Sequence, residues 1–133
     1  MKTKFLSALT LLLTLTLILA SCAVTETSLW DSATYTEDTT VGNGAKTLSV
    51  DIEAEDKKIT ITVKTDKYTL GEALFEHCII NDASFFDTAN GIKADWDADN
   101  AYWSFYKGSE YMMHGVGDEI VSGGEAYRLV YTK

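Results

Sequence analysis

The sequence predicts an α+β domain in which a single helix packs on one face of a small sheet. Apolar and polar residues alternate over residues 48–53 and again over 59–64, which is the period of a half-buried strand. A helix start signal follows at Thr69. Two more strand-like segments, 101–107 and 126–132, close the chain. Strands precede and follow a single helix in the sequence, and each strand pattern has only one apolar face. This favours a sheet that the helix covers on one face.

The first 21 residues have the pattern of a secretory signal peptide. Lys2 and Lys4 precede a sixteen-residue apolar run, which is shorter than the ~20 residues that a membrane-spanning helix needs. The run ends in Leu19-Ala20-Ser21-Cys22, which resembles the lipobox of bacterial lipoproteins. The resemblance implies cleavage before Cys22, a diacylglyceryl group on its sulfur, and an extracytoplasmic protein anchored to the cell membrane by lipid. An ordinary signal peptide with a free Cys22 is the alternative.

Residues 22–46 are rich in Thr, Ser, Glu, Asp and Gly, a composition that favours a flexible tether over a packed core. Trp30 and Tyr35 within it are able to dock locally. The folded domain is therefore expected to span 47–133, which is enough chain for one small core.

The charge and cysteine content exclude several functions. A formal net charge of −9 excludes nucleic-acid binding, which needs a basic surface. With Cys22 lipidated, Cys78 has no cysteine partner in the chain, so the core must hold without a disulfide. We expect Cys78 to be buried; a reactive or metal-binding thiol is the less favoured alternative.

The helix pattern runs from Thr69, with Glu72 in the capping-box position, to Ile80. Its apolar stripe follows the spacing of one helix face: Leu70, Ala73, Leu74, His77 and Cys78. His77 lies at the border of the stripe, where a hydrogen-bonded structural histidine is more common than a catalytic one.

The sequence offers no catalytic set. Residues 95–100 place carboxylates at positions one, three and five of a calcium-like loop, but Asn100 stands where the turn glycine belongs and Tyr106 where a closing acid belongs. An acidic solvated turn is the better interpretation, after a short strand expected over 91–96. No serine or cysteine is placed as a nucleophile, so we expect neither an enzyme nor a bound cofactor.

Aromatic residues dominate the strand 102–106. Alternation places Trp103 and Phe105 on one sheet face and Tyr102, Ser104 and Tyr106 on the other. A single helix covers one face only, so one aromatic set should line a surface. Completion of a small core by these rings is the alternative.

The pattern Tyr102-Trp103-x-Phe105-x-x-Gly108, followed by Gly115-Val116-x-Asp118, resembles the closing strand and loop of the C-terminal domain of transcobalamin and intrinsic factor. The resemblance covers nearly the whole folded part and implies a small β-grasp-like sheet with one helix. In those carriers, this domain lies over the upper face of the corrin ring and touches it through the tyrosine-tryptophan strand and adjoining loops.

The resemblance implies ligand contact by Trp103, Ser104 and Phe105. From the residues themselves we add Met112, Met113 and His114, because exposed thioethers suit a large, flat, mostly apolar ligand. His114 is chemically able to ligate cobalt, but a loop histidine is more often solvated.

These features predict a lipid-anchored binding module that captures cobalamin, another cobamide or a similar flat ligand with a hydrophobic face. The carriers enclose cobalamin with a large helical barrel, for which this chain has no room. The expected site therefore covers one ligand face or is completed by a protein partner. A structural or adhesive cell-surface module that binds protein or polysaccharide is the alternative.

Overall fold

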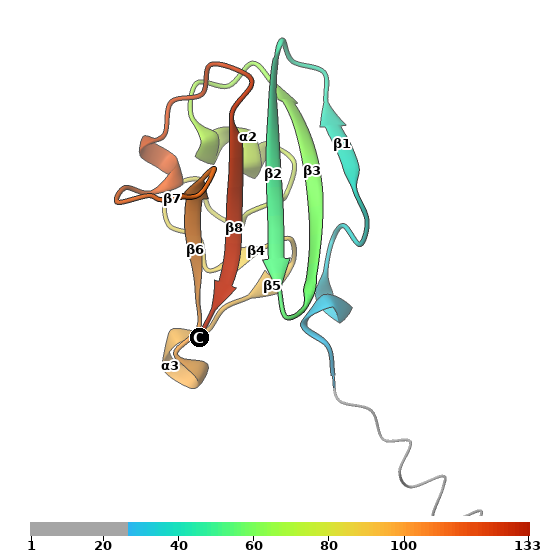
Figure 1. The fold of residues 1–133 in the computed structure, drawn as a ribbon, viewed down its shortest axis with the longest axis vertical. Coiled ribbons are helices and arrows are strands. Elements are labelled where there is room, and N and C mark those ends of the chain that lie inside the picture. Colours follow the sequence, from blue (N-terminus) through green and yellow to red (C-terminus); the bar gives the residue numbers. More distant parts are fainter. Residues whose placement is uncertain (1–26) are drawn as a thin grey trace, which may run out of the picture.

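The computed structural model describes residues 27–133, which form one mixed sheet of six strands with a helix behind it (Figure 1). The predicted α+β class, with a mostly sheet body and one packed helix, is confirmed. In spatial order the strands are β1 (Thr39–Gly42), β3 (Lys57–Thr65), β2 (Lys46–Ala54), β8 (Ala126–Thr132), β6 (Tyr102–Lys107) and β7 (Glu110–Tyr111).

The hairpin of β2 and β3 forms the centre of the sheet, as the alternating pattern predicts. The two strands pair antiparallel from Lys46 opposite Thr65 to Ala54 opposite Lys57. On the helix side, aliphatic residues of both strands are fully or almost fully buried: Leu48, Val50, Ile52, Ile59, Ile61 and Val63. All of them except Leu48 are β-branched, which favours the strand conformation, and together they fill the space under the helix.

Strand β8 completes the core beside β2, to which it runs parallel with Val50 opposite Tyr127. Strand β6 pairs antiparallel with β8, and the two-residue β7 pairs with the end of β6. The last strand, 126–132, has the bounds that its alternation predicts. The parallel contact of β2 and β8 brings the two ends of the domain sequence together at the centre of the sheet.

Helix α2 (Leu70–Glu76) begins where predicted, because the Thr69 hydroxyl accepts a hydrogen bond from the backbone N–H of Glu72 at 3.2 Å. It ends four residues before the predicted Ile80. Cys78 has φ of 57°, a left-handed conformation that stops the helix. The prediction of a buried Cys78 is therefore wrong: the side chain lies past the helix end and is exposed.

Part of the segment expected to be flexible, 22–46, is ordered in the structure; residues 22–26 lie outside the described residues, as does the signal sequence with Cys22. The 3-10 helix η1 (Leu29–Ser32) is capped by Ser28. Trp30 is buried and its indole Nε1 donates to the carbonyl of Ala54 at 3.0 Å. Strand β1 then pairs parallel with β3. Backbone pairing and one buried ring thus outweigh the polar composition.

The connection between α2 and β6 is mostly irregular. The strand predicted over 91–96 is reduced to β5 (Ile92–Lys93), which pairs with β4 (Thr88–Ala89). The expected acidic turn contains the one-turn helix α3 (Trp96–Asp99), because the Asp95 carboxylate accepts from the backbone N–H of Ala98 at 3.0 Å. The 3-10 helix η2 (Val116–Asp118) lies in the connection from β7 to β8.

Among residues 27–133, no helix is both long enough and apolar enough to cross a membrane.

Candidate functional site

Strand β6 turns its two aromatic sets to opposite faces, as predicted, but the face that carries Trp103 and Phe105 is the covered one. These side chains are 9% and 7% exposed. The indole Nε1 of Trp103 donates to the carbonyl of Ile92 at 3.1 Å, and its ring meets that of Tyr131 edge-on at 5.6 Å. Both rings therefore belong to the core, and their contact with a ligand stays a prediction.

Ser104 lies on the opposite face of β6, between Tyr102 and Tyr106. Its hydroxyl is 2.6 Å from that of Thr132 on the neighbouring strand, and the residue is only 3% exposed. A ligand has little access to this hydroxyl, because the flanking side chains cover it. Ser104 therefore links β6 to β8, and its contact with a ligand stays a prediction.

The loop Met112–His114 follows β7, and its three side chains have different surroundings. Met112 is half-buried against the core, and its backbone N–H donates to the carbonyl of Phe105 at 3.0 Å. Met113 is 90% exposed. The His114 side chain is 43% exposed, with Nε2 at 3.8 Å from Glu119 Oε1. Of these three predicted residues, Met113 and His114 are accessible to a ligand.

A second loop, residues 82–86, presents another exposed ring. The Asp82 carboxylate accepts hydrogen bonds from the backbone N–H groups of Ser84 at 2.8 Å and Phe85 at 3.0 Å. These two bonds hold the pKa of the Asp82 carboxyl below its usual range. The turn that they form leaves the Phe85 ring 92% exposed. No pattern in the sequence indicates Phe85 as a site residue.

The two loops lie against each other near η2. A Cβ atom added at Gly117 would lie 3.1 Å from the carbonyl oxygen of Ala83, and one at Gly115 would lie 3.6 Å from that of Ser84. Between the loops is a hollow of about 250 Å³, lined by Ser84, Phe85, Gly115, Gly117 and Asp118. We call Phe85, Met113 and this hollow the loop-pair site.

Glu119 contacts both the loop that carries His114 and the end of β6, and so connects one side of the loop-pair site to the sheet. Its side chain is almost fully buried, with Oε1 at 3.8 Å from His114 Nε2 and Oε2 at 3.8 Å from Lys107 Nζ. Its backbone carbonyl accepts from the N–H of Leu70 at 2.8 Å. Glu119 thus connects the His114 loop, the end of β6 and the start of α2. Nothing in the local sequence signals this role, because the three partners are far apart in the chain.

The Tyr127 phenol lies next to this carboxylate in the core. Burial raises its pKa far above the usual range, and the negative charges of Glu119 and Glu125 act in the same direction. Among residues 27–133 the hydroxyl has no hydrogen-bond partner, and Lys107 Nζ lies 6.0 Å from the centre of its ring. The phenol therefore stays neutral and serves as packing rather than as an acid or base.

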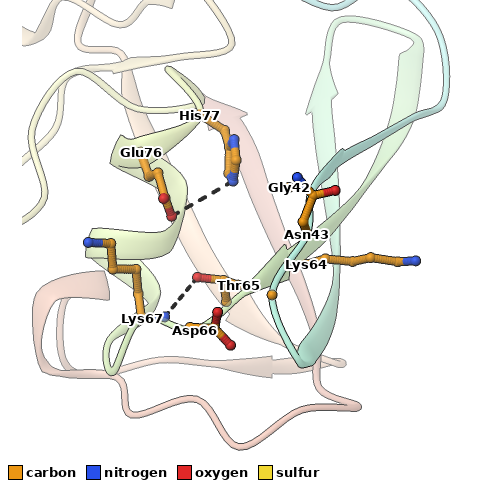
Figure 2. A pocket seen from close by; sticks show the side chains of 9 residues that line it. Gly42, Asn43, Lys64, Thr65, Asp66, Lys67, Glu76 and His77 are labelled. Atoms are coloured by element: carbon orange, nitrogen blue, oxygen red, sulfur yellow. Dashed lines mark hydrogen bonds and ion pairs between the residues drawn. The ribbon is translucent and has the colours of Figure 1, made fainter.

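A polar pocket of about 450 Å³ lies at the β1–β2 turn, between the end of β3 and the end of α2 (Figure 2). His77 Nε2 is 3.8 Å from Glu76 Oε2, and a Cβ at Gly42 would approach the same nitrogen to 2.8 Å. Asp66 accepts from the backbone N–H of Ala45 at 2.9 Å. Figure 2 shows the Lys64 side chain extending away from His77. The imidazole thus packs against the turn, but its buried Nε2 has no hydrogen-bond partner among residues 27–133, unlike the hydrogen-bonded structural histidine that was expected. The polar walls of the pocket do not suit an apolar ligand.

A third hollow, of about 490 Å³, lies beside the end of α2, and its walls are more apolar than those of the pocket at the β1–β2 turn. Phe75 and Cys78 are exposed at its border, and Ile79 and Ile80 form part of its wall. In the part of the chain that the structure describes, no group of three or more His, Cys, Asp and Glu side chains is arranged to hold a metal ion.

Comparisons with known proteins show the fold. No family model matches the chain, and no curated protein matches it. Among solved structures, a protein from Ruminococcus gnavus described as a candidate metal-binding protein is similar over 66% of this chain and 97% of its own, with 24% identity and a TM-score of 0.61. Haptocorrin in complex with Cbi is similar over 66% of this chain, with 15% identity and a TM-score of 0.53.

The likeness to haptocorrin spans only 25% of that protein, so it concerns one domain of a longer chain. At these identities the comparisons establish a shared architecture and no shared site. Residues 27–133 therefore have a transcobalamin-like fold, in agreement with the resemblance of strand 102–107 and the Gly115–Asp118 segment.

Proposed function

We propose that this chain is a non-enzymatic, lipid-anchored extracytoplasmic module that binds a cobamide or a similar flat ligand at the loop-pair site. The observation that carries the proposal is the placement of Phe85 and Met113, 92% and 90% exposed, on two loops in mutual contact. Exposed side chains of this size lose favourable burial, so their presence on two neighbouring loops favours contact with a ligand or partner.

The shape of the site limits how it binds. A hollow of about 250 Å³ is smaller than the ~300–1,000 Å³ of pockets that enclose a small molecule. A large flat ligand would rest on Phe85 and Met113 and keep its other face open. The flexible thioether of Met113 adapts to such a surface, and the Phe85 ring offers a flat one. Binding by this chain alone is therefore weak, and a second protein completes the site.

The structural likeness supports the ligand class. Haptocorrin, which shares the architecture of this chain over 25% of its own length at a TM-score of 0.53, was solved in complex with Cbi. The predicted lipobox ending in Cys22 supports the anchor and the extracytoplasmic location. The absence of a catalytic set from the sequence supports a binding role.

Equilibrium dialysis of the full-length chain against cyanocobalamin, followed by the absorbance of the corrin ring, tests the proposal. We expect retention of ligand at millimolar concentration. The double variant Phe85→Ser with Met113→Ser should raise the dissociation constant at least about tenfold, since one-sided burial of each side chain contributes about 1 kcal/mol. The control Phe75→Ser alters a ring that is 53% exposed outside the site and should bind as the unmodified chain does.

Absence of ligand retention at millimolar cyanocobalamin would remove cobamides from consideration. Unchanged binding by the double variant would place the ligand elsewhere on the chain.

A further inference from the structure

The face of the sheet opposite α2 is uncovered within residues 27–133 (Figure 1). Alternation along paired strands defines which side chains it carries, because residues opposite each other in a ladder share a face. Tyrosines lie along β6 and β7, and hydroxyl, carboxylate and cationic groups lie on β2, β3 and β8. We call it the open face and define it by these residues: Thr47, Ser49, Asp51, Glu53, Lys58, Thr60, Thr62, Lys64, Tyr102, Ser104, Tyr106, Tyr111, Ala126, Arg128, Val130 and Thr132.

Two aromatic pairs stand at the two ends of β6. At its start, the Trp96 and Tyr102 rings meet edge-on at 6.1 Å and are 61% and 42% exposed. At its end, the Tyr106 and Tyr111 rings meet edge-on at 5.4 Å, and Tyr111 is 51% exposed. Tyr102 and Tyr106 are four residues apart on one strand, a spacing of about 13 Å. An occupant that touches both pairs is therefore extended.

The polar groups beside these rings are already fixed in place. Arg128 Nε donates to Glu53 Oε2 at 2.6 Å, and its guanidinium lies 4.9 Å from the centre of the Tyr106 ring. The Asp51 carboxylate accepts from the Thr60 hydroxyl at 2.7 Å and lies 3.7 Å from Lys58 Nζ. Side chains held in this way lose little conformational entropy when a ligand arrives.

The charge balance of the open face identifies the chemistry of its occupant. Asp51 and Glu53 are paired with Lys58 and Arg128, and Lys64 adds one positive charge, so the face stays close to neutral in a chain of net charge −9. Neutrality gives no attraction to a strongly charged polymer. It has few aliphatic side chains, and it carries Lys, Glu, Asp and Ser residues, which are depleted in protein interfaces. A neutral chain with flat C–H surfaces and many hydroxyl groups fits both the rings and the polar groups.

We propose that the open face binds a neutral polysaccharide, which lies along β6 with sugar rings against the two aromatic pairs and hydroxyl groups toward Glu53, Arg128 and Asp51. The loop-pair site is not part of this surface. Both sites can therefore be tested separately on the same chain.

Native gel electrophoresis of the full-length chain through laminarin, xyloglucan or galactomannan tests the proposal. We expect at least one of these neutral polysaccharides to retard the chain. The variants Trp96→Ala with Tyr102→Ala, and Tyr106→Ala with Tyr111→Ala, should each weaken retardation at least tenfold in apparent affinity. Tyr68→Ala, which removes a ring that is 63% exposed between β3 and α2, should leave it unchanged.

A second measurement uses Trp96, whose exposed indole emission should change on addition of the oligosaccharide from the retarding polymer. Lack of retardation by all three polymers overturns the proposal, as does full retention by both double variants. Stronger retardation by polygalacturonate would mean that charge drives binding. Retention on immobilised gelatin without any glycan binding would assign the face to a protein, which also overturns it.

Discussion

The substitution Gly71→Ala tests whether α2 positions the loop-pair site. In an exposed helix interior, replacing glycine by alanine stabilises by about 1 kcal/mol, because alanine restricts the unfolded chain and favours the helix. Gly71 is buried in the first turn of α2. A Cβ atom there would lie 1.9 Å from the carbonyl oxygen of Ala83 and 3.2 Å from Cα of Gly117. Both neighbours belong to the loops that form the site.

At Gly71 the cost of the steric clash outweighs the gain in helix stability. An approach of 1.9 Å to a backbone oxygen is far inside van der Waals contact, so the 82–86 loop must move away from the helix by more than an ångström. Overpacking of this kind destabilises by about 1–3 kcal/mol, and here the backbone on both sides opposes relief. We expect a net loss of about 2 kcal/mol in the free energy of unfolding, which lowers Tm by about 10 °C in a domain of this size.

Calorimetric melting of the full-length chain measures the effect. Gly115→Ala is the matched control: its Cβ would meet only the Ser84 carbonyl at 3.6 Å, and its φ of −79° suits any residue. We expect the control to remain within about 0.5 kcal/mol of the unmodified chain. A Tm for Gly71→Ala at or above that of the unmodified chain would refute the close contact of α2 with the two loops.

Three further measurements test other parts of the structure. Trp30→Ala should reduce the free energy of unfolding in urea by about 3–5 kcal/mol, because it removes a buried indole. A loss under about 1 kcal/mol would mean that residues 27–46 do not contribute to the folded domain. Backbone hydrogen bonds from Ser84 and Phe85 lower the pKa of Asp82, so the turn that they form should persist at neutral pH and be lost only as the pH falls below the ordinary value of about 3.8. The NMR shift of the Phe85 amide should report this transition, and Asp82→Asn should abolish it. Cys78 should react with a disulfide reagent in the folded chain, and equal labelling of Cys78→Ser would contradict its exposure.

The elements that the sequence predicts correctly depend on local patterns. The hairpin of β2 and β3 follows from period-2 alternation, and the start of α2 follows from the Thr69 cap. The end of the helix does not, because the left-handed conformation of Cys78 is unusual for a residue with a side chain and has no sequence signal here. Strand β1 is also missed, since its polar residues become a strand only by pairing with β3 about 20 residues later in the chain.

The residues of the candidate site were likewise predicted only where a local sequence pattern marks them. The exposed Met113 loop was predicted because a methionine pair between two glycines is conspicuous in the sequence. Phe85 was not, because its role depends on contact between loops about 30 residues apart. Trp103 and Phe105 were correctly placed together on one face of β6, but alternation alone does not tell which of the two aromatic faces the helix covers. Burial of a given face is decided by the packing of the whole domain.

The arrangement of the ends of the domain connects the proposed anchor to the proposed site. The described chain begins at η1, where Leu29 N–H donates to Glu55 at the β2–β3 turn. The contacts of Glu119 with Lys107 and with the start of α2 lie at the opposite end of the sheet, near the end of β6 and the start of β2 (Figure 1). Strand β2 alone separates these ends by about 27 Å. A lipid on Cys22 would therefore hold the η1 end toward the membrane, and the loop-pair site would face outward, where a ligand and a second protein can reach it.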